Sequence, residues 1–172
     1  MNDQPRAFLQ NSAKAQQRAR EYRDKYEYDK SIREAQESIE LALKAIFYAF
    51  DVAPPKSHNF SEDDFKRLLE AITKGADPNG PQIRATDFQK QYIYARFWGT
   101  FYETAKYGLE KLKIGPGNFF DKDEADLAVK HAGFCYATAC TAVTVHAENA
   151  KKYKERLKVE KQEDKKPDRD AA

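Results

Sequence analysis

The residues best suited to hold an anion lie where a long apolar stretch ends. Lys44 is near that end, and Lys56 and His58 follow just after two consecutive prolines. Ammonium and imidazole groups gathered at one end of a helix can hold a phosphate. Two other roles remain open. Lys44 follows Glu40 by four residues, the spacing of an exposed helical ion pair, and His58 could form loop hydrogen bonds or cap the next helix.

A second group of candidates lies in an unusually aromatic stretch from about Ala85 to Lys111. Arg96 sits among these rings, where a guanidinium can stack on an aromatic face or reach a phosphate. Tyr94, Trp98 and Tyr107 could stack a nucleobase, as aromatic side chains do in proteins that bind single strands. Aromatic residues at helical spacing also form cores and subunit interfaces, so this alternative stays open.

The histidines and cysteines favour neither a metal site nor a disulfide. His131 and His146 are fifteen residues apart with no third ligand near them. Cys135 and Cys140 are five apart in one helical run, which is poor geometry for a disulfide, and they read as small core residues. We therefore expect no metal and no cofactor.

Composition describes one domain with polar ends. Of 172 residues, 41% are hydrophobic and 34% charged, so the apolar residues must gather on helix faces. Basic residues outnumber acidic ones nine to six in 151–172 and seven to four in 14–33, whereas 34–150 has 13 basic and 17 acidic residues. Such ends can attract nucleic acid weakly. No segment resembles a signal peptide or a membrane span, so we expect a cytoplasmic protein without membrane contact.

The spacing of apolar residues predicts an all-α, antiparallel bundle of about five helices. The clearest helix covers about 27–51, where one face recurs at steps of three and four: Ile32, Ala35, Ile39, Ala42, Leu43, Ile46 and Phe50. Ser61 and Asp121 are predicted to cap later helices, Asp121 in a capping box with Glu124. The other helices are expected over about 8–25, 61–74, 85–111 and 122–156.

The C-terminal end differs from the rest. From residue 157 onward the chain is charged and almost free of aromatic residues, so it cannot bury enough apolar surface to order itself. We therefore divide the chain into a helical bundle domain, 1–156, and a disordered charged tail, 157–172.

One block of sequence resembles a known family. Residues 28–46 (YDKSIREAQESIELALKAI), followed by Pro-Pro-Lys-Ser-His at 54–58, resemble the HEPN family (higher eukaryotes and prokaryotes nucleotide-binding), and the likeness extends over about 28–145. The resemblance implies an antiparallel helical bundle, often dimeric, that binds a nucleotide or RNA. It also implies that a nucleotidyltransferase can be its protein partner, as in toxin–antitoxin pairs.

Many members of that family are metal-independent ribonucleases that carry an arginine, four to six residues and then a histidine. No arginine stands at that distance before any of the three histidines, and the nearest upstream arginines are Arg33 and Arg96. We therefore favour a binding module without catalysis. Two alternatives stay open: a toxin-type ribonuclease that combines His58 with Arg96 of a dimer mate, and a purely structural homo-oligomer.

Overall fold

A computed structural model describes residues 3–56, 60–75 and 84–163, and for residues 147–163 it describes the backbone alone. Within these ranges the chain forms helices and one isolated β-bridge. The helices are α1 (Gln4–Asp24), α2 (Tyr28–Ala49), α3 (Glu62–Gly75), α4 (Ala85–Gly99), α5 (Tyr102–Tyr107) and α6 (Lys122–Glu163), with short 3-10 helices η1 (Glu110–Leu112) and η2 (Pro116–Asn118) between the last two.

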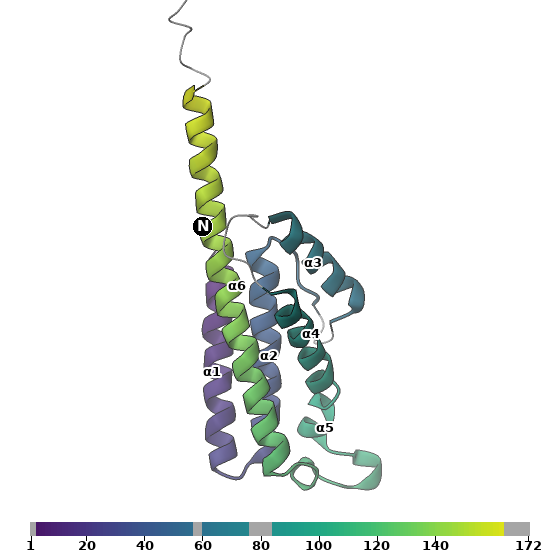
Figure 1. Ribbon diagram of the computed structural model, residues 1–172. Coiled ribbons are helices and arrows are strands. Elements are labelled where there is room, and N and C mark those ends of the chain that lie inside the picture. The colour runs from purple at the N-terminus through teal and green to yellow at the C-terminus, as the bar shows by residue number, and fades with distance from the viewer. Residues whose placement is uncertain (1–2, 57–59, 76–83, 164–172) are drawn as a thin grey trace, which may run out of the picture.

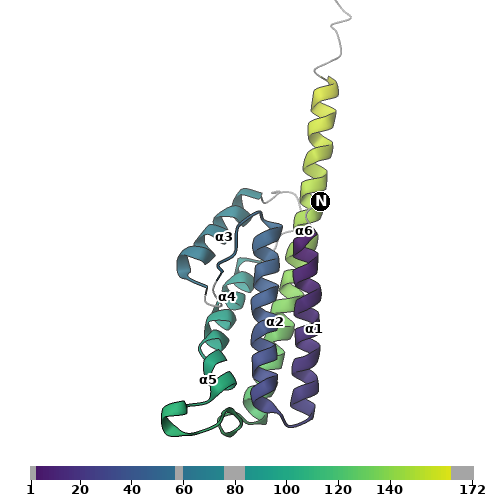
Figure 2. The same cartoon turned by 180° about the vertical axis from the view of Figure 1, so that it is seen from behind.

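The helices form an up-and-down bundle with α2 at its centre. α1, α2 and α6 lie side by side, α4 and α5 pack along another side of α2, and α3 lies across the upper end of α4 (Figure 1). The view from behind shows α2 between α1 and the α4–α5 side (Figure 2). The predicted all-α antiparallel bundle is thereby confirmed.

The apolar face predicted for α2 is the core of the molecule. Ile32, Ile39, Leu43 and Ile46 are all fully buried or nearly so. Ala45 and Phe47, outside the predicted stripe, are buried as well. A helix that is buried this widely must be covered from more than one side, which is what α1, α4, α5 and α6 do.

The mostly polar helix α1 packs on α2 through small residues. Ser12, Ala15 and Ala19 are fully buried along its inner side. Ser12 Oγ donates to the backbone carbonyl of Ser38 at 2.8 Å, and Ser31 Oγ donates to the carbonyl of Ala19 at 2.8 Å. Short side chains let the two backbones approach closely, and these hydrogen bonds satisfy the buried hydroxyls.

Both predicted helix caps are present. Ser61 Oγ accepts from the backbone N–H of Asp64 at 3.1 Å, while Asp64 Oδ2 accepts from the backbone N–H of Ser61 at 3.0 Å. Burial opposes ionisation of Asp64, but hydrogen bonds from Ser61 and Arg67 outweigh it and lower the pKa of that carboxyl. At the start of α6, Glu124 Oε2 accepts from the backbone N–H of Asp121 at 2.9 Å, the predicted capping box.

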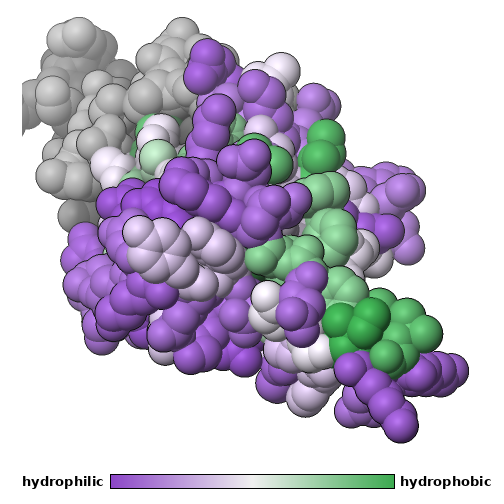
Figure 3. Space-filling view, turned by 90° about the horizontal axis from the view of Figure 1, so that it is seen from below, coloured by the Kyte–Doolittle hydropathy of each residue, from purple (hydrophilic) through white to green (hydrophobic). Residues whose placement is uncertain are grey.

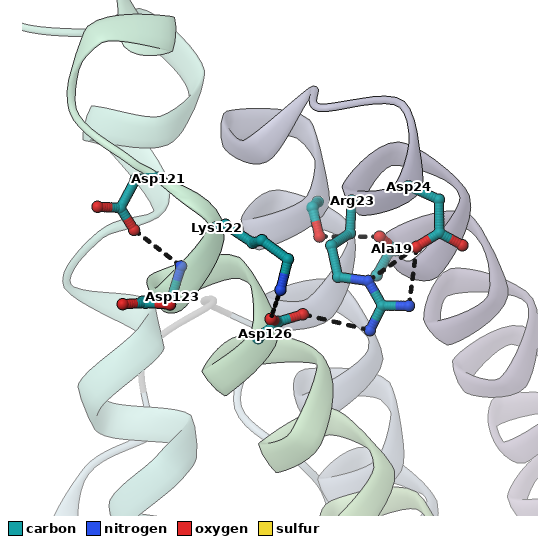
Figure 4. Close-up of polar contacts among 8 residues, drawn as sticks. Ala19, Arg23, Asp24, Asp121, Lys122, Asp123 and Asp126 are labelled. Atoms are coloured by element: carbon teal, nitrogen blue, oxygen red, sulfur yellow. Dashed lines mark hydrogen bonds and ion pairs between the residues drawn. The ribbon is translucent and has the colours of Figure 1, made fainter.

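Ion pairs tie the first turn of α6 to the last turn of α1 (Figure 4). Asp126 receives Lys122 Nζ at 2.6 Å and Arg23 Nη1 at 3.4 Å. Arg23 also contacts Asp24 at 2.9 Å. Because these groups are exposed to solvent, which screens their charges, the pairs orient the start of α6 more than they stabilise it.

The predicted helix over 85–111 is wrong in extent. α4 ends at Gly99, α5 begins at Tyr102, and α5 ends at Tyr107. Thr100 Oγ1 donates to the backbone carbonyl of Phe97 at 2.6 Å. This bond competes with the backbone hydrogen bonds that would continue the helix beyond Gly99. Gly108 then has φ +70°, which stops the second piece.

The C-terminal boundary also differs from the prediction. The backbone of α6 stays helical through 157–163, where the tail was expected to start, and projects beyond the bundle (Figure 1). The remainder of the predicted tail, 164–172, and most of the predicted loop, 76–83, lie outside the described residues.

The burial of α2 leads to a stability prediction. Ile39→Ala and Leu43→Ala should each lower the free energy of unfolding by roughly 2–5 kcal/mol, because each leaves a cavity among fully packed neighbours. Denaturant titration measures the loss. Glu37→Ala, on the exposed side of α2, is the control and should change stability by less than about 0.5 kcal/mol. Equal losses in all three variants would contradict the assigned inner face.

Candidate functional site

A row of polar side chains runs along α2 at steps of four residues. Gln36 Nε2 donates to Glu40 Oε2 at 3.4 Å, and Lys44 Nζ lies 2.7 Å from Glu40 Oε1. The Lys44 and Glu40 side chains are only 16% and 7% exposed. The ion pair predicted from the spacing therefore forms, but it is mostly buried rather than on the surface. Removing one partner of such a pair leaves a charge poorly solvated, so the two residues depend on each other.

Arg96 connects α4 to the segment that precedes α3. Its Nη1 donates to the backbone carbonyl of Phe60 at 3.2 Å, and its guanidinium lies over the ring of Tyr92, 6.0 Å from the centroid. Tyr92 in turn stacks on Phe65 of α3, with centroids 4.6 Å apart. A guanidinium has five N–H donors, so this contact leaves others available to a ligand.

Phe60 links Arg96 of α4 to the end of α2. The buried ring of Phe60 packs against Phe47 of α2 at 5.9 Å, and Phe47 lies one turn after Lys44 on that helix. Lys56 is exposed in the connection that leads toward Phe60. His58 lies outside the described residues. Phe60 thus joins Arg96 to the turn of α2 that follows Lys44, while Lys56 is near Phe60 in the sequence alone.

The aromatic candidates have different surroundings. Trp98 is only 2% exposed and its Nε1 donates to Nδ1 of His131 on α6 at 3.1 Å. Tyr94 is half-buried and stacks on the same imidazole, with centroids 3.7 Å apart. Trp98 therefore serves the α4–α6 contact and does not present its ring to a base or a second subunit, contrary to the hypothesis. Tyr107 is exposed, with Lys106 Nζ 5.0 Å from its ring centroid.

His131 is a structural residue that the sequence did not single out for this role. Because its Nδ1 accepts a hydrogen bond from Trp98, the ring is neutral with its proton on Nε2. Burial, and secondarily the charge of Lys130, lowers the pKa of His131. Burial also lowers the pKa of His146, whose ring lies 4.5 Å from that of Phe50, although Asp51 opposes the shift.

Other kinds of site find little support in the described part of the chain. It contains no cluster of three histidine, cysteine or acidic residues that could hold a metal ion. No helix there has the length and apolar character needed to cross a membrane. An open hollow on α3 is lined by Lys66, Leu69, Glu70, Thr73 and Lys74, none of them a predicted site residue. Cys135 is buried, which raises the pKa of its thiol.

The fold defines a class of protein: an antiparallel helical bundle packed around its second helix. A model of the HEPN domain matches residues 6–140, and the chain belongs to this family. The match adds α1 to the region of resemblance seen in the sequence and ends within α6. The chain matches no curated protein.

The Trp98–His131 contact predicts how stability depends on pH. Since the pKa of His131 is lowered in the folded state, the unfolded state binds more protons, and stability falls as pH decreases below the unfolded value of about 6.5. His131→Asn keeps an acceptor for Trp98 but does not titrate. Its melting temperature should therefore fall less than that of the wild type between about pH 7.5 and 5.5, as thermal unfolding can measure.

His146 contributes to the same pH dependence with the same sign, since its pKa is also lowered. His146→Asn should remove a separate part of the slope, and the double variant should have the flattest profile. Identical profiles for the wild type and His131→Asn would show that the imidazole of His131 does not titrate differently in the two states.

Proposed function

We propose that this HEPN-domain protein binds a nucleotide or an RNA segment through phosphate, using Lys44, Lys56, His58 and Arg96, and that it does so without catalysing a reaction. The observation that carries the proposal is the bond between Arg96 and the carbonyl of Phe60 at 3.2 Å. This bond holds the guanidinium of α4 beside the connection that bears Lys56 and His58 in the sequence. Family membership supports the same class of ligand.

The charges of the site suggest unequal roles for its residues. Glu40 neutralises much of the charge of Lys44, so Lys44 adds little net attraction for an anion. Arg96 and Lys56 are exposed and, among the described residues, neither forms an ion pair. These two residues therefore supply the net positive charge. A site with so few unneutralised charges should bind phosphate groups with modest affinity, and this affinity should fall as the salt concentration rises.

A ribonuclease of the toxin type is the second candidate, and one observation favours it. Arg96 contacts Phe60, which follows His58 by two residues in the sequence. A positioned imidazole and guanidinium can activate a 2′-hydroxyl and stabilise phosphate charge. The missing arginine-to-histidine spacing in the sequence makes binding the preferred function.

The binding proposal is tested with a panel of nucleotides and short single-stranded RNAs. A ligand that binds the folded state raises the melting temperature by mass action. Arg96→Gln and Lys56→Gln should each weaken binding and reduce the slope of log affinity against log salt by about one. Arg84→Gln is the matched control, because Arg84 is an exposed arginine of the same region, paired with Asp87. Cleavage of the RNA in the same samples would favour the ribonuclease. The proposed site would be contradicted if no ligand raised the melting temperature, or if Arg84→Gln weakened binding as much as Arg96→Gln and Lys56→Gln.

We also infer a homodimer, formed through a surface of α4 and α6 that includes Phe97 but not the buried Trp98. With Trp98 buried, the exposed large side chains of this region are Ile93, Phe97 and Leu127. Interface cores are rich in such residues. A nucleotidyltransferase as protein partner is supported by the family resemblance alone.

Phe97→Glu should convert the dimer to a monomer while leaving the fold intact, since the Phe97 ring is 45% exposed in the single chain. Sedimentation should give about twice the 19.8 kDa chain mass for the wild type and the chain mass for the variant. Tyr26→Glu, at an exposed tyrosine of the α1–α2 turn, is the control and should remain dimeric. A monomeric wild type at tens of micromolar would refute the dimer.

A further inference from the structure

An apolar projection stands apart from the core at the lower end of the bundle. We call residues 107–114 the knuckle. Leu112 is 63% and Tyr107 56% exposed, Leu109 and Ile114 are exposed as well, and no residue of η1 is buried. Seen from below, hydrophobic residues gather on the side of the molecule where α5 and the 3-10 helices lie, with hydrophilic residues beside them (Figure 3). The knuckle thus presents aliphatic side chains that its own chain does not cover.

The backbone of the knuckle is held in one shape. Leu109 N–H donates to the carbonyl of Ile114 at 2.9 Å, and Ile114 N–H donates to the carbonyl of Leu109 at 3.3 Å. Gly108 closes the turn so tightly that an added Cβ would lie 2.2 Å from the Ile114 carbonyl oxygen. Lys113 adopts φ +55°, an unfavourable conformation for a residue with a side chain. The exposed apolar surface is therefore held on a backbone that includes an unfavourable conformation.

The charges around the knuckle are mainly positive. Lys106, Lys111 and Lys113 flank its apolar residues, with Glu110 as the one acidic residue of 106–114. Lys106 is bonded to the Tyr102 hydroxyl at 3.4 Å. No described carboxylate pairs with Lys111 or Lys113. The surface is complementary to an apolar pocket with a negatively charged border.

Three of the chain's own acidic residues near this end are already engaged. Asp121 and Glu124 form the cap of α6, and Asp126 is paired with Lys122 and Arg23. A second copy that used these three residues to neutralise the lysines would have to give up the contacts that hold the start of α6. Nucleic acid fits poorly too. Tyr107 could stack one base, but the leucine and isoleucine side chains that make up most of the apolar surface offer no stacking surface, and interfaces with nucleic acid are polar.

We propose that the knuckle is a docking site for a different protein, one that offers an apolar pocket bordered by carboxylates and receives Leu112 as the central side chain. Leu109, Ile114 and Tyr107 surround that anchor, and Lys111 and Lys113 pair with the border. The site is separate from the phosphate-binding residues of α2 and α4, so it does not depend on the proposed function.

A photo-crosslinking amino acid tests the contact in the full chain. Benzophenone-alanine is placed at Leu112 and, as the control, at Tyr26, an even more exposed residue of the α1–α2 turn. The expected result is a protein adduct at Leu112 that is missing at Tyr26, with the crosslinked partner residue lying in an apolar, carboxylate-bordered pocket. An adduct with a second copy of the chain, with RNA or with lipid, or none above the Tyr26 control, overturns the proposal.

The partner protein identified by crosslinking is then purified. Its binding to the knuckle should depend on both the shape and the charge of the knuckle. The double variant Lys111→Glu/Lys113→Glu should weaken binding at least about tenfold, the effect of roughly 1.4 kcal/mol. Gly108→Ala should weaken it comparably by distorting the turn, whereas Gly117→Ala, where an added Cβ meets nothing within 4 Å, should not. Circular dichroism checks that all variants remain folded. Equal affinity of Gly108→Ala and the wild type, in folded protein, would refute a role for the knuckle's shape.

Discussion

The burial of α2 on several sides is the constraint on which the rest of the structure depends. Each of the helices α1, α4, α5 and α6 covers part of α2, so polar groups on most sides of this helix are shielded from water. Ser31, Gln36, Ser38 and Glu40 are all buried, and each has a hydrogen-bonding partner. Among the described residues the buried side-chain atoms without a partner are Gln91 Oε1 and His146 Nδ1, neither of them on α2. The polar row of α2 is therefore required by the packing, and any ligand role for Lys44 is added to that structural one.

Local sequence signals predicted the helices well where they were strong. Steps of three and four on α2, and capping residues at Ser61 and Asp121, depend on neighbours within one turn, and the structure contains all of them. The break in the predicted 85–111 helix was missed because one glycine is tolerated inside many helices. In the structure the local bond from Thr100 Oγ1 to the carbonyl of Phe97 accompanies the end of α4, and Trp98, two residues before Thr100, is held by His131 of α6.

The residue types of the candidate site could be predicted from the sequence, but the contacts that these residues make could not. Lysine, histidine and arginine indicated phosphate chemistry because of their charge, yet nothing in the sequence showed that Arg96 would contact Phe60. That contact depends on how α4 crosses α2. The same crossing decides which aromatic residues are covered. The sequence showed an aromatic stretch but not which rings are covered, and the structure has Trp98 buried against α6 and Phe97 exposed.

The interruption of the fourth helix links the two surfaces of the molecule. A continuous helix to Lys111 would have carried Leu109 and Tyr107 along one straight rod. Instead α4 ends after placing Arg96 beside Phe60, and α5 ends at Gly108, whose positive φ turns the chain outward. The upper part of this stretch is thereby held against α2, while the lower part is free to form a separate projection. The two proposed contact surfaces, the residues around Arg96 and the knuckle, therefore lie at opposite ends of this stretch of chain.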